Sequence, residues 1–217
     1  MEPDKEAKVN CVVSQYLTAK KIVNESGYQK EIEWQEQVIK QTFTESDLLR
    51  EAAWVILCSG FKESIVRKKF NLLSLCFWDW ESCKKIIDSR ANTLECALAV
   101  FANKKKLEAI LSTAEKISQE GFNNLKKRIY KDPINTLKGF DYIGDITAYH
   151  LAKNIGINIA KPDRHLFRIA EAANIGDTQK LCSEISKRTN DPIAVVDIVL
   201  WRYATIVPNY LQTFLAV

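Results

Sequence analysis

The sequence predicts an all-α protein of two closely packed helical lobes. Apolar residues recur every three or four positions along most of the chain, which places them on one face of a helix. Few stretches show the alternation of a half-buried strand. The 217 residues include only seven glycines and five prolines, and 47% are hydrophobic, enough for one large core or two small ones. The helical spacing is clearest in Leu48, Leu49, Ala52, Val55 and Ile56, and in Leu107, Ile110, Leu111, Ala114 and Ile117.

Glycines, prolines and capping residues mark where one helix ends and the next begins. They divide the chain into roughly ten or eleven helices of ordinary length. We expect N-terminal helices over residues 1–45 that pack on the second lobe, a helical lobe over 46–135, and a last region over 136–217, all in one compact unit. The expected breaks are Gly27, Gly60, Asn92-Thr93, Gly121, Asp132-Pro133, Gly139, Gly144, Gly156, Pro162, Gly176, Asp191-Pro192 and Pro208.

Several classes of protein are excluded by composition. No apolar run approaches the roughly 20 residues of a membrane-crossing helix, and the polar first ten residues are followed by no signal-peptide core. We therefore expect an intracellular, cytoplasmic protein. The six cysteines are widely scattered, with no CxxC pair and no Cys/His cluster at zinc-ligand spacing. We expect reduced thiols, no metal and no cofactor.

The net charge of +4 is too small to name a partner by itself. Three short basic groups occupy residues 67–69, 104–106 and 126–128. Together they could line one face and attract nucleic acid. Taken singly, each is the ordinary solvated face of a helix.

The most informative stretch for function is the predicted hairpin over residues 137–154. A short helix ends near Leu137, a tight turn carries Tyr142-Ile143-Gly144, and a second helix runs from about Asp145 to Asn154. Such a turn exposes backbone N–H groups at the positive end of the helix dipole, where a phosphate can bind. The alternative is a plain αα-hairpin with a glycine turn.

A carboxylate follows the hairpin at the start of another predicted helix. Pro162-Asp163 opens an amphipathic helix that carries Leu166, Ile169, Ala170 and Ala173 on one side. Asp163 is thus a natural N-cap. The same carboxylate could polarise water or balance a developing sugar cation, so capping and chemistry are compatible.

The hairpin and the aspartate together resemble the helix-hairpin-helix Gly/Pro-Asp (HhH-GPD) superfamily of base-excision DNA glycosylases. This group holds endonuclease III, the alkyladenine glycosylases and the 8-oxoguanine glycosylases. The family hairpin pattern LPGVG-x-K-TA matches "FDYIGDITA" at 140–148, and the family VD-x-H segment matches residues 162–165. Two upstream stretches, "LREAAWVILCSGFKESIVRKKFNLLS" and "FANKKKLEAILSTAEKIS", are also similar, so the likeness runs from about Asp47 to Tyr203.

The resemblance implies a role for each matched residue. Asp163 would be the catalytic carboxylate, with Ile143, Gly144 and Asp145 gripping a DNA phosphate through their backbone groups, aided by Thr147 and His165. His165 could equally be a half-buried residue satisfied by a neighbour. Tyr142 replaces the first family glycine and could lie along the sugar-phosphate backbone or pack on the hairpin.

Departures from the family pattern narrow the expected chemistry. Bifunctional members carry a Schiff-base lysine at the position of Ile146, so we expect hydrolysis that leaves an abasic site. Lys161 or Lys153 could supply a displaced lyase amine. Only Cys182 follows the aspartate, which excludes the iron–sulfur cluster that several relatives bind through four C-terminal cysteines.

The resemblance also implies that the target base is flipped out of double-stranded DNA. The wedge that fills the gap would lie in residues 59–63, through Phe61 or Lys62, although either could be an ordinary surface or packing residue. Trp34 is our first candidate for stacking on the flipped base, because it lies on a charged stretch. The other aromatic candidates are Tyr28, Trp54, Phe77, Trp78 and Trp80; Trp201 is expected in the core.

Several alternatives remain open at this stage. The chain could be a lyase that uses a displaced lysine, a glycosylase directed at hypermodified bases of phage DNA, or a non-catalytic protein that binds DNA structure and keeps Asp163 only as a cap. In each case the partner is DNA, no membrane is involved, and a monomer is expected.

Overall fold

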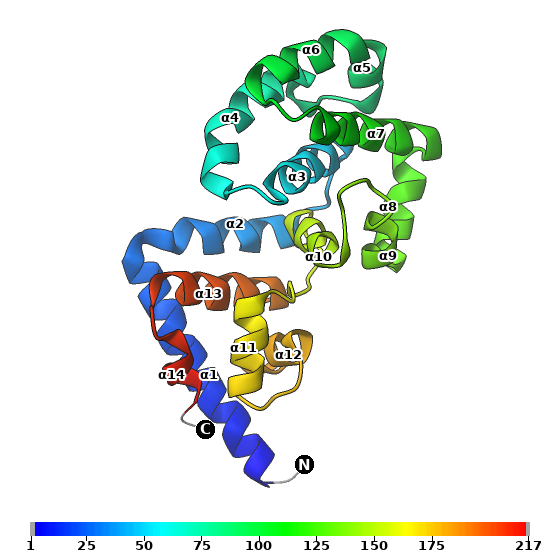
Figure 1. The fold of residues 1–217 in the computed structure, drawn as a ribbon. Coiled ribbons are helices and arrows are strands. Elements are labelled where there is room, and N and C mark those ends of the chain that lie inside the picture. Colours follow the sequence, from blue (N-terminus) through cyan, green and yellow to red (C-terminus); the bar gives the residue numbers. More distant parts are fainter. Residues whose placement is uncertain (1–2, 216–217) are drawn as a thin grey trace. The chain divides into compact units, whose positions relative to one another are not determined.

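The protein is all-α over residues 3–215, which a computed structural model describes (Figure 1). This confirms the predicted class. Short helices make the elements more numerous than the sequence suggested. Examples of five or six residues are α5 (Cys83–Asp88), α9 (Pro133–Leu137) and α14 (Tyr210–Phe214). No helix in this part of the chain is long and apolar enough to cross a membrane.

The helices form two compact units, residues 3–41 with 156–215, and residues 42–155. This division differs from the expected one, because residues 136–155 group with 42–135, whereas 156–215 group with the N-terminal helices. The chain thus builds its second unit as an insertion into the first.

The first unit packs its helices against α13, which contacts α1, α2, α11, α12 and α14. α1 (Pro3–Val23) and α13 (Ile193–Ile206) lie against each other, and α12 and α14 also contact α1. The remaining elements are the π-helical turn η1 (Asn24–Tyr28), α2 (Gln29–Lys40), α11 (Arg164–Ala172), α12 (Thr178–Thr189) and α14 (Tyr210–Phe214).

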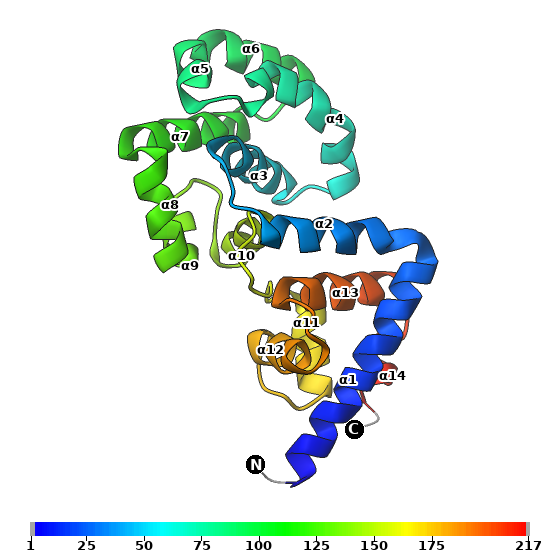
Figure 2. The same ribbon diagram turned by 180° about the vertical axis from the view of Figure 1, so that it is seen from behind.

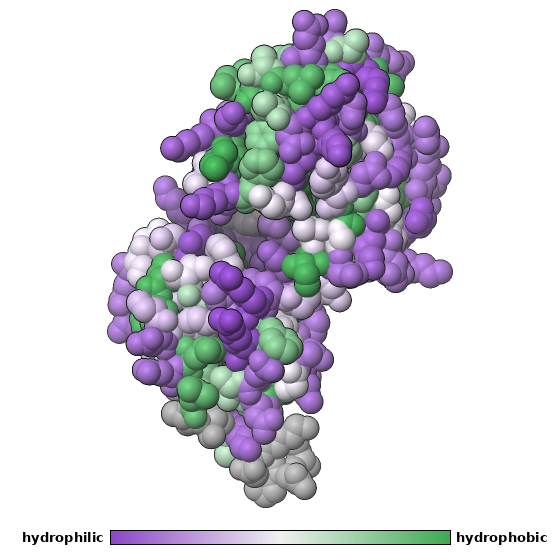
Figure 3. Space-filling view, in the orientation of Figure 1, coloured by the Kyte–Doolittle hydropathy of each residue, from purple (hydrophilic) through white to green (hydrophobic). Residues whose placement is uncertain are grey.

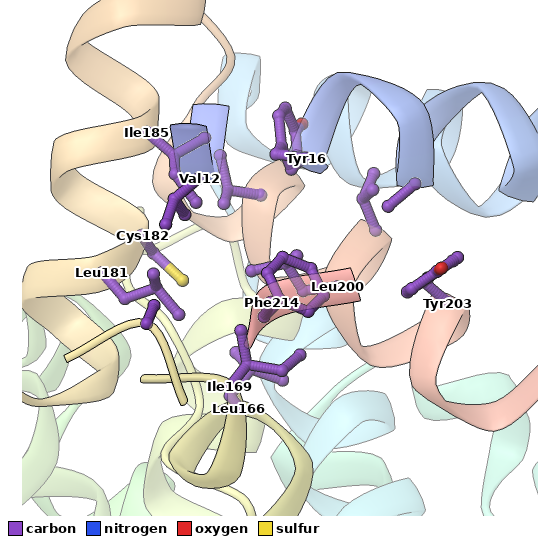
Figure 4. Close-up of a cluster of buried hydrophobic side chains, with 14 of the residues drawn as sticks. Val12, Tyr16, Leu166, Ile169, Leu181, Cys182, Ile185, Leu200, Tyr203 and Phe214 are labelled. Atoms are coloured by element: carbon purple, nitrogen blue, oxygen red, sulfur yellow. The ribbon is translucent and has the colours of Figure 1, made fainter. Parts of the chain in front are cut away.

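The core of this unit is contributed by helices far apart in sequence (Figure 4). Val12 and Tyr16 of α1 lie among side chains of α11, α12 and α13, and Phe214 of α14 is fully buried with them. The Tyr16 hydroxyl donates to Asp191 Oδ2 at 2.6 Å, and Lys20 pairs with the same carboxylate at 2.8 Å. These bonds join α1 to the loop before α13.

The second unit is centred on α3 (Glu45–Cys58), which contacts α4, α7 and α10 (Figure 2). Both apolar series predicted for helices are buried here, in α3 and in α7 (Lys104–Glu120). The other elements are α4 (Glu63–Cys76), the 3-10 turn η2 (Trp78–Trp80), α5 (Cys83–Asp88), α6 (Arg90–Val100), α8 (Phe122–Lys131), α9 (Pro133–Leu137) and α10 (Asp145–Asn154).

One expectation about the cysteines is wrong. Cys76 at the end of α4 and Cys96 in α6 form a disulfide, with their Cα atoms 5.6 Å apart. Their spacing of 20 residues does not predict the pair. The disulfide forms because α4 and α6 pack against each other. The other four cysteines are thiols, as expected.

Backbone geometry requires a glycine at position 156, just after α10. Gly156 has a φ of +91°, and a Cβ added to it would lie 2.6 Å from the Val38 carbonyl oxygen of α2. Gly27, in the same unit, has a similar φ of +86° but open space around it. A side chain at Gly27 would therefore meet only the strain of a positive φ, whereas one at Gly156 would also clash with the backbone of α2.

We predict that Gly156→Ala lowers the free energy of unfolding by about 3 kcal/mol or more, because strain and a backbone clash add. Gly27→Ala, the matched control, should cost only about 1 kcal/mol from the positive φ. Urea unfolding of both variants measures the difference. Equal losses would contradict the close approach of Gly156 to α2.

Candidate functional site

The hairpin forms where the sequence places it. α9 ends at Leu137 and α10 begins at Asp145, and Phe140 and Ile143 are buried and anchor the turn between them. Tyr142 adopts a φ of +64°, the left-handed conformation that the family glycine would provide at this position. Its side chain is 43% exposed, so the turn presents an aromatic ring to solvent.

The donors at the start of α10 are not the three that the sequence suggested. The Ile143 N–H donates to the Phe140 carbonyl at 3.2 Å, and the Gly144 N–H donates to Thr147 Oγ1 at 2.7 Å. The N–H groups of Asp145, Ile146 and Thr147 have no acceptor within the described residues, since Gly144 has no side chain to cap them. These three donors form the positive end of the helix.

Acidic side chains near this helix start are paired with lysines. Asp141 Oδ1 accepts from Lys116 at 2.9 Å, and this hydrogen bond lowers the pKa of Asp141. Lys116 also donates to the Gly139 carbonyl at 3.0 Å. Asp145 forms an ion pair with Lys138. The lysines offset the negative charge that would otherwise oppose an incoming phosphate.

An open hollow of about 520 Å³ lies at the start of α10. Its walls are Ser59 at the end of α3 and the hairpin residues Tyr142, Ile143, Gly144, Asp145, Ile146 and Thr147. A Cβ built on Gly144 meets nothing within 4 Å, so the helix start is open to an approaching group. The hollow combines backbone donors with a wide entrance, which suits a phosphate.

The predicted wedge loop lies in the same unit and borders this hollow through Ser59. Phe61 is 41% exposed, and its ring packs on Phe101 with 5.3 Å between ring centroids. Lys62 is exposed and occupies the position before α4 without capping it through its side chain. The loop therefore exposes an aromatic side chain, Phe61, and a basic one, Lys62. The Phe61 ring is held by its contact with Phe101.

A buried hydrogen bond holds α10 on α3. Asn154 Nδ2 donates to Glu51 Oε2 at 2.9 Å, and Arg50 donates to the other oxygen at 3.2 Å. Burial of Glu51 raises its pKa, and the arginine opposes that shift. This contact fixes the far end of the hairpin helix.

In the other unit, Asp163 caps α11 as predicted. Its Oδ1 atom accepts from the N–H groups of His165 at 2.9 Å and Leu166 at 3.1 Å. Leu166, Ile169, Ala170 and Ala173 are fully buried, which confirms the predicted apolar face. No hydrogen bond to Oδ2 occurs in the described part of the chain, so a single oxygen does the capping. The second oxygen remains available to another group.

The loop that carries Asp163 is fixed by buried side chains. Asp197 of α13, 1% exposed, accepts from the Lys161 N–H at 2.6 Å. Gln179 of α12 binds both the N–H and the carbonyl of Ala160. Asn158 accepts from the Ala194 N–H at 3.1 Å, at the start of α13. Sequence reasoning missed Asp197 and Gln179, because their partners are backbone atoms distant in sequence.

His165 has partners at both ring nitrogens. Its Nδ1 lies 3.1 Å from the hydroxyl of the buried Tyr210, and Arg164 donates to its Nε2 at 3.4 Å. Of the two interpretations above, the neighbour-satisfied histidine describes this arrangement. Arg164 is exposed and places a positive charge at this helix start.

Most aromatic candidates for a base pocket are packing residues. Phe77 and Trp80 are buried and stacked, Trp54 is half-buried against Phe70, and Trp78 donates to Thr93. Tyr28 and Trp201 both lie against the Arg202 guanidinium. Trp34 is 39% exposed on α2 and is the one whose ring has no aromatic or cation contact in the described residues.

In each of the three basic groups, residues 67–69, 104–106 and 126–128, one lysine has a structural role. Lys69, Lys106 and Lys126 donate to the carbonyl oxygens of Val100, Ile56 and Phe43, and each lies over an aromatic ring. Arg67 pairs with Glu63, and Arg128 with Glu120. The groups are therefore partly structural rather than wholly solvated faces.

The possible lyase amines differ in position. Lys153 is buried and lies two turns along α10 from the hollow, while Lys161 is half-buried beside Asp163. Ile146 is exposed and lines the hollow. Within residues described by the structure, no three His, Cys, Asp or Glu side chains are grouped to hold a metal ion.

The structure thus brings the wedge loop and the hairpin together in one unit, and Asp163 and His165 together in the other. Comparisons of the chain with protein-family models, with curated proteins and with solved structures gave no match. The function must therefore be argued from the residues themselves.

We predict that Gly144→Ala and Gly144→Val leave the melting temperature within about 2 °C of the wild-type value, because a Cβ there meets open space and the backbone is extended. Affinity for a DNA duplex should fall progressively with side-chain size, by roughly tenfold for valine, since a side chain obstructs phosphate approach. Thermal unfolding and fluorescence anisotropy give the two readouts. Unchanged affinity in both variants would exclude the hollow as a phosphate site.

Proposed function

We propose that the protein is a DNA glycosylase that flips a damaged or modified base out of the duplex and hydrolyses its N-glycosidic bond. The observation that carries the proposal is the geometry of Asp163, which caps α11 through Oδ1 alone and leaves Oδ2 unbonded in the described structure. The resemblance of residues 140–148 and 162–165 to the HhH-GPD superfamily supports the same conclusion.

The chemistry requires a carboxylate that is held still. As the C1′–N bond breaks, its electron pair leaves with the base, and positive charge develops on the deoxyribose ring. A fixed carboxylate oxygen stabilises this charge and accepts a proton from the water whose oxygen bonds to C1′. The products are a free base and an abasic site. Asp197, through the Lys161 N–H, and the two helix donors restrict the movement of Asp163.

DNA binding is assigned to the second unit. The unbonded N–H groups of Asp145, Ile146 and Thr147 suit a phosphate, which positions a protein on DNA without reading sequence. Phe61 and Lys62, beside the hollow, are the candidate wedge that enters the base stack. The identity of the excised base is left to experiment, including the hypermodified bases of phage DNA.

Hydrolysis without strand cleavage is the proposed outcome. The position of the family's Schiff-base lysine is occupied by Ile146, which has no nucleophile. Lys153 is buried at the far end of α10, so a lyase reaction would depend on Lys161. Borohydride trapping detects such an amine, because it reduces the imine to a stable cross-link.

We predict that the wild-type protein, incubated with duplexes that carry a panel of damaged or hypermodified bases, produces strand breaks only after alkali treatment. Asp163→Asn should lower the excision rate at least 1,000-fold while lowering the free energy of unfolding by less than about 1 kcal/mol, because asparagine also caps helices. Gel electrophoresis and urea unfolding provide the measurements. Asp177→Asn, at the cap of α12, is the matched control and should retain full activity.

Other outcomes assign a different function. Breaks without alkali, together with borohydride trapping that Lys161→Met abolishes, would make the protein a lyase. Tight duplex binding with no excision of any base, unchanged in Asp163→Asn, would leave a non-catalytic DNA-binding protein in which Asp163 serves only as a cap.

A further inference from the structure

Five side chains of the second unit form a continuous chain of contacts between α4 and the hairpin. In order they are Lys69, Phe101, Phe61, Lys106 and Tyr142, and we call them the cation–aromatic chain. The successive separations are 5.8 Å from the Lys69 ammonium to the Phe101 ring, 5.3 Å between the rings of Phe101 and Phe61, and 5.5 Å and 5.0 Å from the Lys106 ammonium to Phe61 and Tyr142. Each separation is within the range for an attractive contact.

Lys106 is the link that joins the wedge loop to the hairpin. It is only 3% exposed, in the first turn of α7, and its ammonium donates to the Ile56 carbonyl in the last turn of α3. That carbonyl is one of the acceptors that a helix leaves open at its C-terminal end. The two aromatic rings complete the surroundings of the charge.

The position is costly for a lysine. No carboxylate pairs with Lys106 within the described residues, and burial lowers its pKa, with the neighbouring Cys58 opposing that shift. Lys106 also lies at the N-terminal end of α7, where the helix dipole disfavours a cation. A methionine would fill the same space without the charge, but it would leave the Ile56 carbonyl without its donor, so the hydrogen bond accounts for a polar group here and the two rings are what a cation adds.

The two rings that Lys106 contacts are the exposed aromatics of the candidate DNA surface. Phe61 and Tyr142 are each about two-fifths exposed, and they come from segments about 80 residues apart in sequence. Tyr142 holds a left-handed φ of +64°, which is unfavourable for a residue other than glycine. Contact with the ammonium offsets this cost and fixes the direction of the ring.

We propose that Lys106 is a positioning residue that holds Phe61 of the wedge loop and Tyr142 of the hairpin in one fixed arrangement for contact with DNA. This inference rests on the proposed function for its DNA-binding consequence, but the coupling of the two rings is a property of the protein alone. Lys106 acts through these rings and does not itself touch the reacting atoms.

A double-mutant cycle tests the coupling without DNA. Phe61→Leu and Tyr142→Leu are made singly and together, and the equilibrium constant of unfolding is measured in urea. We expect the double variant to depart from the product of the single effects by a factor of roughly 3 to 10, the size of one partly desolvated cation–π contact. In the Lys106→Met background this factor should fall to about one. Should that variant fail to fold, Lys106→Gln, which keeps a donor for Ile56, replaces it.

A second arm measures the consequence for DNA. The probe is a duplex with a tetrahydrofuran abasic-site analogue, which the protein cannot hydrolyse. Lys106→Met should weaken its binding roughly tenfold, while Lys106→Arg restores most of the affinity. Lys126→Met is the matched control, since Lys126 also donates to a backbone carbonyl, at 2.6 Å, and lies over two rings, Phe43 and Phe122. It should lose less than twofold.

The unfolding cycle tests the positioning role of Lys106, and the binding measurement tests its consequence for DNA. A coupling factor near one with Lys106 present, or one that survives Lys106→Met, overturns the positioning role whatever the DNA result. An equal loss of affinity in Lys106→Met and Lys126→Met overturns it as well. A wild-type protein that does not bind the duplex contradicts the proposed function, and the unfolding cycle then still decides whether Lys106 couples the rings.

Discussion

The structure depends on one constraint, that the backbone groups left open at every helix end must find partners. A chain with many short helices has many such ends, and side chains provide the partners at several of them. Asp163 satisfies the start of α11, Lys106 the end of α3 and Lys69 the end of α6. The start of α10 is different, because Gly144 leaves its donors open. That open helix start is what makes the hollow a candidate phosphate site.

Helix capping also explains how one carboxylate can serve structure and chemistry together. Two donors bind the same oxygen of Asp163, and Asp197 and Gln179 hold the preceding loop from α13 and α12. These hydrogen bonds hold the carboxylate in place, which the proposed hydrolysis requires. Apolar residues such as Val12 and Phe214 stabilise the unit that supports it (Figure 4). On the face that Figure 3 shows, hydrophilic and apolar side chains are both exposed.

Sequence reasoning succeeded where the signal is local. Asp145–Asn154 was predicted to its first and last residue, and Asp163 was recognised as a cap, because helix periodicity and capping depend on neighbours within four positions. It failed where partners are distant: the Cys76–Cys96 disulfide, the hydrogen bond from Lys161 to Asp197, and the burial of Lys106. The local sequence does not distinguish a lysine that is buried beside a carbonyl, such as Lys106, from a lysine that is exposed to solvent. The sequence also did not show that the N–H groups of Ile143 and Gly144 are already hydrogen-bonded within the turn. Such bonds depend on backbone dihedral angles, which residue types restrict but do not determine.

The central proposal is that the Asp163 carboxylate acts on the C1′ carbon of a flipped nucleotide. The most direct measurement is a crystal structure of the protein bound to a duplex that carries a non-hydrolysable abasic-site analogue. We predict that Asp163 Oδ2 faces C1′ of the analogue. A duplex bound elsewhere, or a sugar remote from Asp163, would contradict the account.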